Sequence, residues 1–207
     1  MYGASQRAST RTGSAPFGVD LVALSVAILL LNLPLFAGQV PSAFLLTSAA
    51  MSGEWWRWLT HPFVHVSLYH AALDVCAFLS LYAALPRGSR ALCAGAALIG
   101  STVAALVSGG IPVAGFCGLS GAGHGMMAAL ALEYLRAPDR ANRWLGGAAF
   151  VLVAGKALIE ALSGSVFFAS WHWGDVGSPV AACHAGGVLG GAVAAYFFRR
   201  RSRIRPR

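Results

Sequence analysis

A few residues that can do chemistry stand inside otherwise apolar stretches of this 207-residue sequence. Ser120 is the third residue of the run GLSG, and His184 opens the run HAGG. His70 and Asp74 are four residues apart, which places them on one face of a helix. A serine hydroxyl becomes a nucleophile when a base such as imidazole takes its proton. These residue types therefore indicate acyl-transfer chemistry.

Acyl transfer also needs fixed hydrogen-bond donors, because its tetrahedral intermediate carries an oxyanion. His70 and Asp74 are candidates to help supply those donors, together with the backbone N–H of Ser120 near a helix N-terminus. Gly118 and Gly121 flank the serine and permit a tight turn and the close approach of a substrate backbone.

The composition of the chain indicates where this chemistry takes place. Apolar residues make up 57% of the sequence and charged residues only 11%, whereas soluble domains carry about 25%. A membrane-spanning helix needs about 20 apolar residues. Six windows come close to that length, at 21–37, 66–85, 91–111, 119–135, 144–162 and 180–198. We expect an all-α, polytopic membrane protein with six transmembrane helices at 18–198, a disordered polar N-terminus at 1–17 and a basic cytoplasmic tail at 199–207.

Basic residues predict the orientation. With six spans, 13 of the 15 Lys and Arg residues fall on one side, which the positive-inside rule identifies as cytoplasmic. Both termini are therefore predicted to be cytoplasmic. Five of the six Trp residues lie in the two long outer connections, 38–65 and 163–179, as expected for an interfacial belt. Topology and contact with the lipid bilayer account for the net charge of +8, so no nucleic-acid partner is predicted.

Depth in the membrane brings the candidate residues together. The second, fourth and sixth windows all run inward, and they carry His70 with Asp74, Ser120 and His184 within roughly the outer 13 Å. Gly187 follows His184 at i+3 and Gly191 at i+7, a spacing that lets another helix approach closely. We expect that helix to carry Ser120, which would bring the serine within hydrogen-bond reach of the histidine without a third residue.

With these features in order, the sequence resembles the rhomboid intramembrane serine proteases. The resemblance implies a six-helix bundle, a Ser120–His184 dyad that cleaves membrane-anchored proteins near the outer face, and His70 and residue 74 at the oxyanion site, with Gly118 beside them. It implies no cofactor. The matching elements are Trp56-Arg57, His61, His65, His70, Asp74, the GLSG run, and His184 with Gly187 and Gly191.

Within that family the chain is most similar to the rhombosortases, because His124-Gly125 follows the serine motif and Lys156 precedes Glu160 by four residues. That resemblance implies a multi-pass protein of the bacterial inner membrane. It implies that the partners are membrane-anchored proteins whose C-terminal tail holds a Gly-Gly motif, a transmembrane segment and basic residues.

Asp74 departs from the family, which usually has Asn at this position. An ionised carboxylate would repel an oxyanion, whereas a protonated carboxyl could donate to it, and an apolar setting favours the protonated form. Asp74 is therefore expected either to be neutral or to orient His70 without touching the oxyanion.

Four more residues have both a structural and a functional interpretation. Arg57 is expected to bind carbonyl groups of the first outer loop, or else lipid headgroups. His124 lies at i+4 from Ser120 and can face the same cavity, where it either packs or assists catalysis. Lys156 and Glu160 share a helix face and form either a neutralising pair or a reader of the substrate's tail.

Three other functions compete with a serine protease. A non-catalytic rhomboid-like protein would bind client transmembrane segments without cutting them, and Asp74 is the feature that favours it. A small transporter would use the intramembrane His, Asp and Glu residues as a proton relay, but it should show paired broken helices. A zinc protease should show the motif HExxH, which the sequence lacks, so no metal site is predicted.

Overall fold

The computed structural model describes residues 18–109 and 114–204; the predicted disordered stretch 1–17 lies outside these ranges. The described chain is helical and has no strand, although Leu46 and Phe116 form one isolated antiparallel bridge. Its six long helices are α1 (Val19–Leu31), α3 (Leu68–Ala84), α4 (Arg87–Val107), α5 (Ser120–Leu135), α6 (Arg140–Ser163) and α7 (Ala182–Ile204).

Each long helix overlaps one of the six predicted apolar windows. The largest differences are six residues, at the end of α1, which stops at Leu31, and at the end of α7. Helix α4 begins at Arg87, directly after Pro86, because proline fits just before or within the first helical turn. Helix α7 continues to Ile204, so the start of the basic segment is helical.

Among the described helices, three segments are long and apolar enough to cross a bilayer: α1 together with the 3-10 helix η1 (Leu33–Ala37), α4, and α6. A fourth forms if the segment Arg57–Phe63 and α3, which meet at 91°, count as one bent span. Helix α5 has only 16 residues. The count of six spans stays a prediction.

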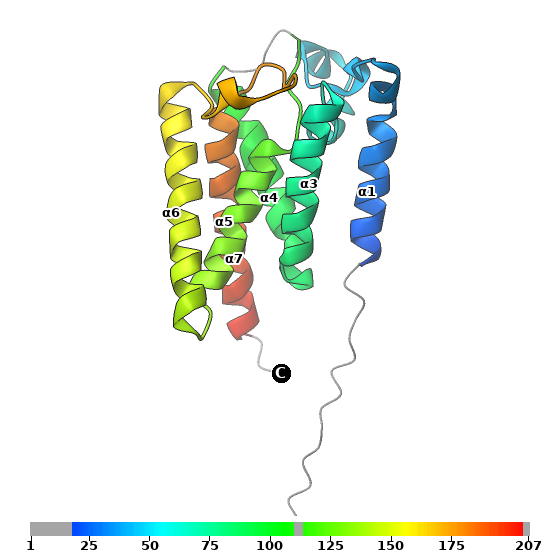
Figure 1. Cartoon of the computed structure of the whole chain (residues 1–207). Helices are drawn as coiled ribbons and strands as arrows, with labels where there is room; N and C mark the ends of the chain where they lie inside the picture. The colour runs from blue at the N-terminus through cyan, green and yellow to red at the C-terminus, as the bar shows by residue number, and fades with distance from the viewer. Residues whose placement is uncertain (1–17, 110–113, 205–207) are drawn as a thin grey trace, which may run out of the picture.

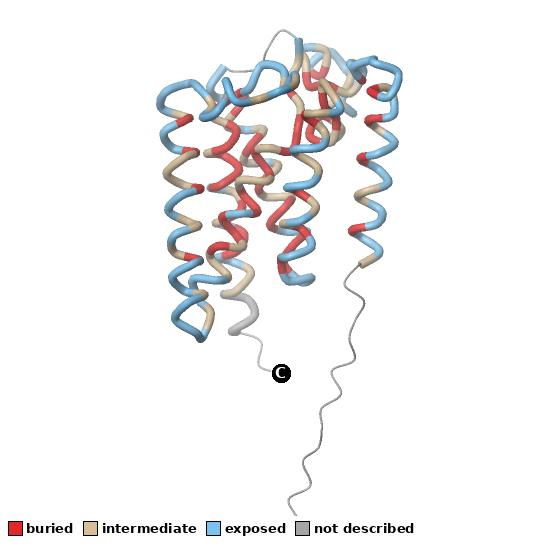
Figure 2. Tube along the Cα trace, in the orientation of Figure 1, coloured by how far each residue is buried: buried red, intermediate tan, exposed pale blue. Residues whose placement is uncertain are grey.

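Helix α5 lies at the centre of the bundle, in contact with α3, α4, α6 and α7. Exposed positions run along α1 and α6 at the periphery, and buried positions concentrate on the helices between them (Figure 2). Helix α1 begins and α7 ends at the same end of the bundle, while the segments that follow α1 and α6 cover the opposite end (Figure 1).

Glycines fix the spacing between α7 and its neighbours. A Cβ atom on Gly187 would lie 1.9 Å from the carbonyl oxygen of Gly121, and one on Gly191 would lie 2.0 Å from that of Gly125. The backbones of α5 and α7 therefore touch, as the spacing after His184 predicts. A second pair of α7 glycines packs in the same way on α4: Gly186 against Gly100 and Gly190 against Ala96.

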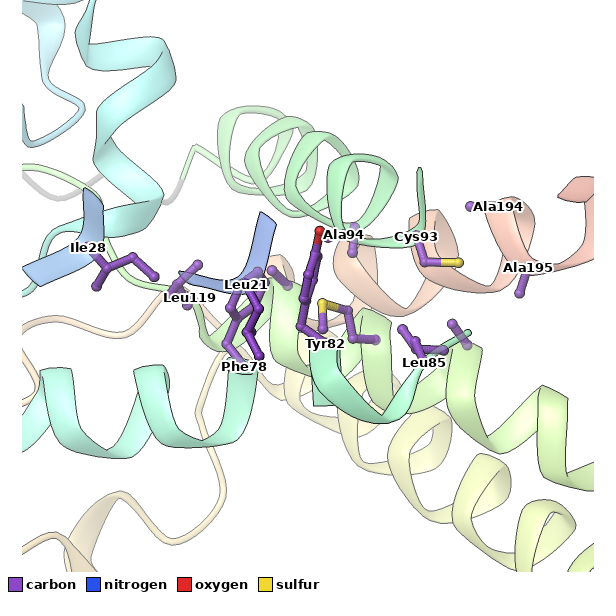
Figure 3. Close-up of a cluster of buried hydrophobic side chains, with 14 residues drawn as sticks. Leu21, Ile28, Phe78, Tyr82, Leu85, Cys93, Ala94, Leu119, Ala194 and Ala195 are labelled. Carbon is purple, nitrogen blue, oxygen red and sulfur yellow. The ribbon is translucent and has the colours of Figure 1, made fainter. Parts of the chain in front are cut away.

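Helix α1 is held to the bundle by apolar packing and by polar contacts at both ends. Leu21 and Ile28 of α1 belong to a buried cluster with Phe78 and Tyr82 of α3 (Figure 3). At the C-terminal end of α1, Asn32 donates from Nδ2 to the carbonyl oxygen of Phe63 at 2.7 Å and is itself buried. At the other end, Asp20 pairs with the buried Arg90 and accepts a hydrogen bond from Tyr82.

The segment after α1 is a structured cap. Four short elements follow η1: η2 (Ser42–Phe44), η3 (Ser48–Ser52), α2 (Arg57–Thr60) and η4 (His61–Phe63). Arg57 donates to the carbonyl oxygens of Ser42 at 2.7 Å and Leu45 at 2.8 Å, and it pairs with Glu54. The buried His61 contacts the carbonyl oxygen of Arg57 and the hydroxyl of Thr102 on α4. These bonds fix the cap over the helices that carry the site.

Candidate active site

Ser120 and His184 meet at the capped end of the bundle. Ser120 is the first residue of α5, which starts there because Gly118 has a φ of 100° that a helix cannot contain. His184 lies in the first turn of α7. The Oγ atom of Ser120 is 3.2 Å from Nε2 of His184, within hydrogen-bond distance. The glycine contacts between α5 and α7 make this distance possible.

The other ring nitrogen of His184 contacts an acid. Nδ1 lies 2.7 Å from Oε2 of Glu160, and Glu160 is fully buried. Ser120 and His184 are thus within hydrogen-bond reach, and Glu160 lies beside them as an acid that the dyad expected from the sequence did not include. The pairing of Glu160 with Lys156 is present as well, at 2.7 Å.

The sequence held a signal for Glu160. It is the third residue from the outer end of the window 144–162, so it lies at the depth of Ser120 and His184. Its window runs outward in the predicted topology, whereas the windows of His70, Ser120 and His184 run inward.

A second histidine packs against the first. The rings of His124 and His184 are stacked, with centroids 4.0 Å apart. Nδ1 of His124 lies 2.8 Å from the carbonyl oxygen of Ser120, and Nε2 lies 3.0 Å from the ammonium group of Lys156. Because a carbonyl can only accept and an ammonium can only donate, His124 is neutral with its proton on Nδ1. Its place in the site is thereby set by α5 and α6 together.

His70, Asp74 and Gly118 lie together on the α3 side of Ser120. Oδ2 of Asp74 accepts a hydrogen bond from the backbone N–H of Leu119 at 2.8 Å and lies 3.2 Å from Nε2 of His70. A Cβ on Gly118 would be 2.8 Å from the same carboxyl oxygen, so this position needs glycine for its backbone angle and for space. Asp74 thus supports the turn before Ser120.

These contacts bear on the two hypotheses for Asp74. Oδ2 of Asp74 accepts a hydrogen bond from the Leu119 amide and also contacts a ring nitrogen of His70. Both contacts fit the hypothesis that Asp74 orients its neighbours. Within the described residues, Nδ1 of His70 is buried without a hydrogen-bond partner, as is Nε2 of His65.

Two hollows reach Ser120. A cavity of about 310 Å³ has His70, Asp74, His124, Lys156 and His184 in its wall, together with residues of the segment 166–180. A second hollow of about 260 Å³ lies among Asp74 and Ala77 of α3, Ser120 of α5 and Val153 of α6. Ser120 therefore borders two hollows, one lined by the segment 166–180 and one among α3, α5 and α6.

Three site residues have the donor types of a metal site. His124, Glu160 and His184 each present one possible ligand atom, all within 4.8 Å of one another. The ammonium group of Lys156 already bonds to two of the three, His124 and Glu160. A cation would have to displace that ammonium group, so the donor set fits the lysine better than a metal ion.

Comparison with known proteins identifies the family. The family model described as the rhomboid domain matches residues 52–201, which hold every candidate site residue named above. The match includes α3, α4, α5 and α6 completely and all but the last three residues of α7. No curated protein matches the chain, and no solved structure does. With its apolar helices, the chain is a multi-pass membrane protein, and the match over residues 52–201 shows that it belongs to the rhomboid family.

Proposed function

We propose that this chain is an intramembrane serine endopeptidase in which Ser120 is the nucleophile and His184 the general base. The observation that carries the proposal is the 3.2 Å contact between Oγ of Ser120 and Nε2 of His184. Nδ1 of His184 faces a carboxylate and must carry the ring proton, so Nε2 has the free lone pair that accepts the serine proton. The rhomboid family, to which the chain belongs, generally consists of serine proteases.

The proposed reaction proceeds in two halves. Ser120 Oγ attacks the scissile carbonyl carbon as its proton passes to His184 Nε2, and the carbonyl oxygen becomes an oxyanion. The imidazolium of His184 then protonates the leaving amine, the C–N bond breaks, and an ester to Ser120 remains. Water from the cavity attacks the ester while His184 takes its proton, and the returned proton restores Ser120 and releases the new C-terminus.

The oxyanion would form next to the start of α5. The N–H of Ser120 lies in the first turn of that helix, where amides have no acceptor within the helix and the helix dipole favours negative charge. His70 lines the same cavity and is the side-chain candidate for a further donor. Asp74 supports this arrangement through its contacts with Leu119 and His70 and does not need to touch the oxyanion.

The substrates we propose are membrane-anchored proteins with C-terminal Gly-Gly tails of the rhombosortase type, cut near the outer face of a bacterial inner membrane. His124 and Lys156 with Glu160 support this subclass, because these three motif residues converge on the site. A substrate helix must unwind near the cut, since its own hydrogen bonds shield the peptide bond. The hollow between α3 and α6 offers the lateral approach, with α6 and the segment around Trp171 as the moving parts.

A serine-directed fluorophosphonate probe tests the proposed reaction. The purified protein in detergent should be labelled, and labelling should be lost in Ser120→Ala and in His184→Ala. The same protein incubated with a tagged Gly-Gly-tail substrate should release a fragment whose new terminus mass spectrometry maps near the Gly-Gly motif. Cleavage of other rhomboid substrates but not of this one would remove the rhombosortase assignment and keep the protease.

Asp74 is the observation that favours a second function, a rhomboid-like protein that binds client transmembrane segments without cutting them. Its carboxyl stands where the family usually has an amide donor. A folded protein that captures a tail segment but takes no fluorophosphonate label would favour this alternative.

A further inference from the structure

The buried carboxyl group of Glu160 is bonded to three different parts of the chain. Oε2 faces Nδ1 of His184 at 2.7 Å. Oε1 accepts from the ammonium group of Lys156 at 2.7 Å and from the backbone N–H of Phe167, also at 2.7 Å. We propose that Glu160 is a positioning residue that completes a Ser120–His184–Glu160 triad, an inference that rests on the proposed protease function.

The donors around Glu160 define its protonation. Ammonium and amide groups donate to Oε1, so that oxygen carries no proton. Oε2 faces an imidazole whose other nitrogen faces the serine hydroxyl. An ionised carboxylate at this place accepts from Nδ1–H and holds the ring in the tautomer that a general base needs.

The carboxylate also acts during the reaction. When His184 takes the serine proton it becomes a cation inside a buried site, where charge interactions are stronger than in water. Glu160 then faces that cation directly, while Lys156 stays on the other carboxylate oxygen. The two positive groups thus use different oxygens and do not compete for one.

The local fold explains how Glu160 comes to this place. Helix α6 ends at Ser163, and Gly164 has a φ of 69°, a left-handed conformation that turns the chain back over the helix end. The turn brings the N–H of Phe167 onto the Glu160 carboxylate. Helix α6 also packs on α7, so the side chain projects toward His184.

A simple Lys156–Glu160 neutralising pair does not account for these contacts. Neutralisation needs one carboxylate oxygen and one ammonium group. Such a pair does not fix where the second oxygen points. In the structure this oxygen lies against Nδ1, the imidazole nitrogen that decides the tautomer of His184. Glu133 differs from Glu160 because both of its carboxylate oxygens contact one cation. It pairs with Arg199 between α5 and α7 at distances of 2.6–3.1 Å.

The test compares Glu160→Gln with Glu160→Asp, and uses Glu133→Gln as the matched control for removing a paired carboxylate elsewhere in the bundle. Fluorophosphonate labelling is followed at several probe concentrations, which separates the maximal labelling rate from the half-saturating concentration. Unfolding temperature in detergent reports folding for every variant.

We expect Glu160→Gln to lower the maximal labelling rate by roughly 10²–10⁴-fold with little change in half-saturating concentration. An amide can donate to Nδ1 and so leave the proton on Nε2, where it blocks the acceptance of the serine proton. Glu160→Asp keeps the charge and should recover at least tenfold of that loss, while Glu133→Gln should label like the unsubstituted protein.

The possible outcomes distinguish failure of the triad proposal from failure of the proposed protease function. If Glu160→Gln labels within about threefold of the unsubstituted protein while Ser120→Ala does not label, the triad is overturned and the protease stands. Equal losses in folded Glu160→Gln and Glu160→Asp would also overturn it, because charge would then not matter. A folded unsubstituted protein that takes no label overturns the proposed function and the triad with it. If Glu160→Gln unfolds, Glu160→Ala replaces it, and a folded Glu160→Ala that labels within about threefold of the unsubstituted protein overturns the triad.

Discussion

Replacing Gly187 by alanine should disable the site without touching any reactive group. The added Cβ would lie 1.9 Å from the carbonyl oxygen of Gly121, and the next neighbours are backbone atoms as well. Ordinary contact starts at 3.4 Å, so α5 and α7 must separate by about 1.5 Å, the difference between these two distances, because no flexible side chain can give way.

That separation acts directly on the contact between Ser120 and His184. If about half of it falls along the line between Ser120 and His184, their contact lengthens from 3.2 Å to about 4 Å, which is no longer a hydrogen bond. A misplacement of about 1 Å lowers a reaction rate by roughly 10²-fold. Overpacking of this kind also costs about 1–3 kcal/mol of folding free energy.

The measurement is the rate of fluorophosphonate labelling in Gly187→Ala, together with unfolding temperature in detergent. The matched control is Gly155→Ala on α6, where an added Cβ meets nothing within 4 Å. We expect the control to label normally and the Gly187 variant to label at least tenfold more slowly while a folded population remains. Normal labelling and an unchanged unfolding temperature in Gly187→Ala would refute the argument that the glycine contact sets the Ser120–His184 distance.

Three further predictions follow from contacts at the site and at α1. Asp74→Asn keeps an oxygen that can accept the hydrogen bond of the Leu119 amide and should label within about tenfold of the unsubstituted protein. Asp74→Leu leaves that amide unpaired, at a cost of about 1–3 kcal/mol, and should label far more slowly. An equal loss in both variants would contradict an orienting role. Lys156→Met removes the counter-charge of a buried carboxylate and should lower the unfolding temperature and slow labelling about tenfold; unchanged values would contradict this. Asn32→Ala leaves the carbonyl oxygen of Phe63 without its side-chain donor and should lower the free energy of unfolding by about 1–3 kcal/mol, read from a denaturant titration in detergent, while the protein that remains folded labels normally.

The positions of the helices could be predicted well from the sequence, because runs of apolar residues between basic clusters leave few alternatives. The window 119–135 and helix α5 differ by one residue at the start, where Gly118 prevents an earlier beginning. The close contact between α5 and α7 was also predictable, since the spacing of Gly187 and Gly191 after His184 has a direct steric meaning.

Side-chain partners across helices were harder to predict, because a partner depends on how each helix is rotated about its axis. Glu133 illustrates the point: its nearest basic residue in the sequence is Arg136, but in the structure it pairs with Arg199 on α7. Glu160 illustrates it again, since the i+4 rule finds Lys156 on the same helix and cannot find His184 on another. Such contacts need the packing angle of two helices, which spacing along one helix does not contain.

The hydrogen bond from the Phe167 amide to Glu160 links the connection between α6 and α7 directly to the imidazole of His184. A substrate that pushes the start of this connection outward must stretch that bond or carry the carboxylate along with it. Either movement loosens His184. Any displacement of this segment is therefore expected to change the position of the Glu160 carboxylate beside His184.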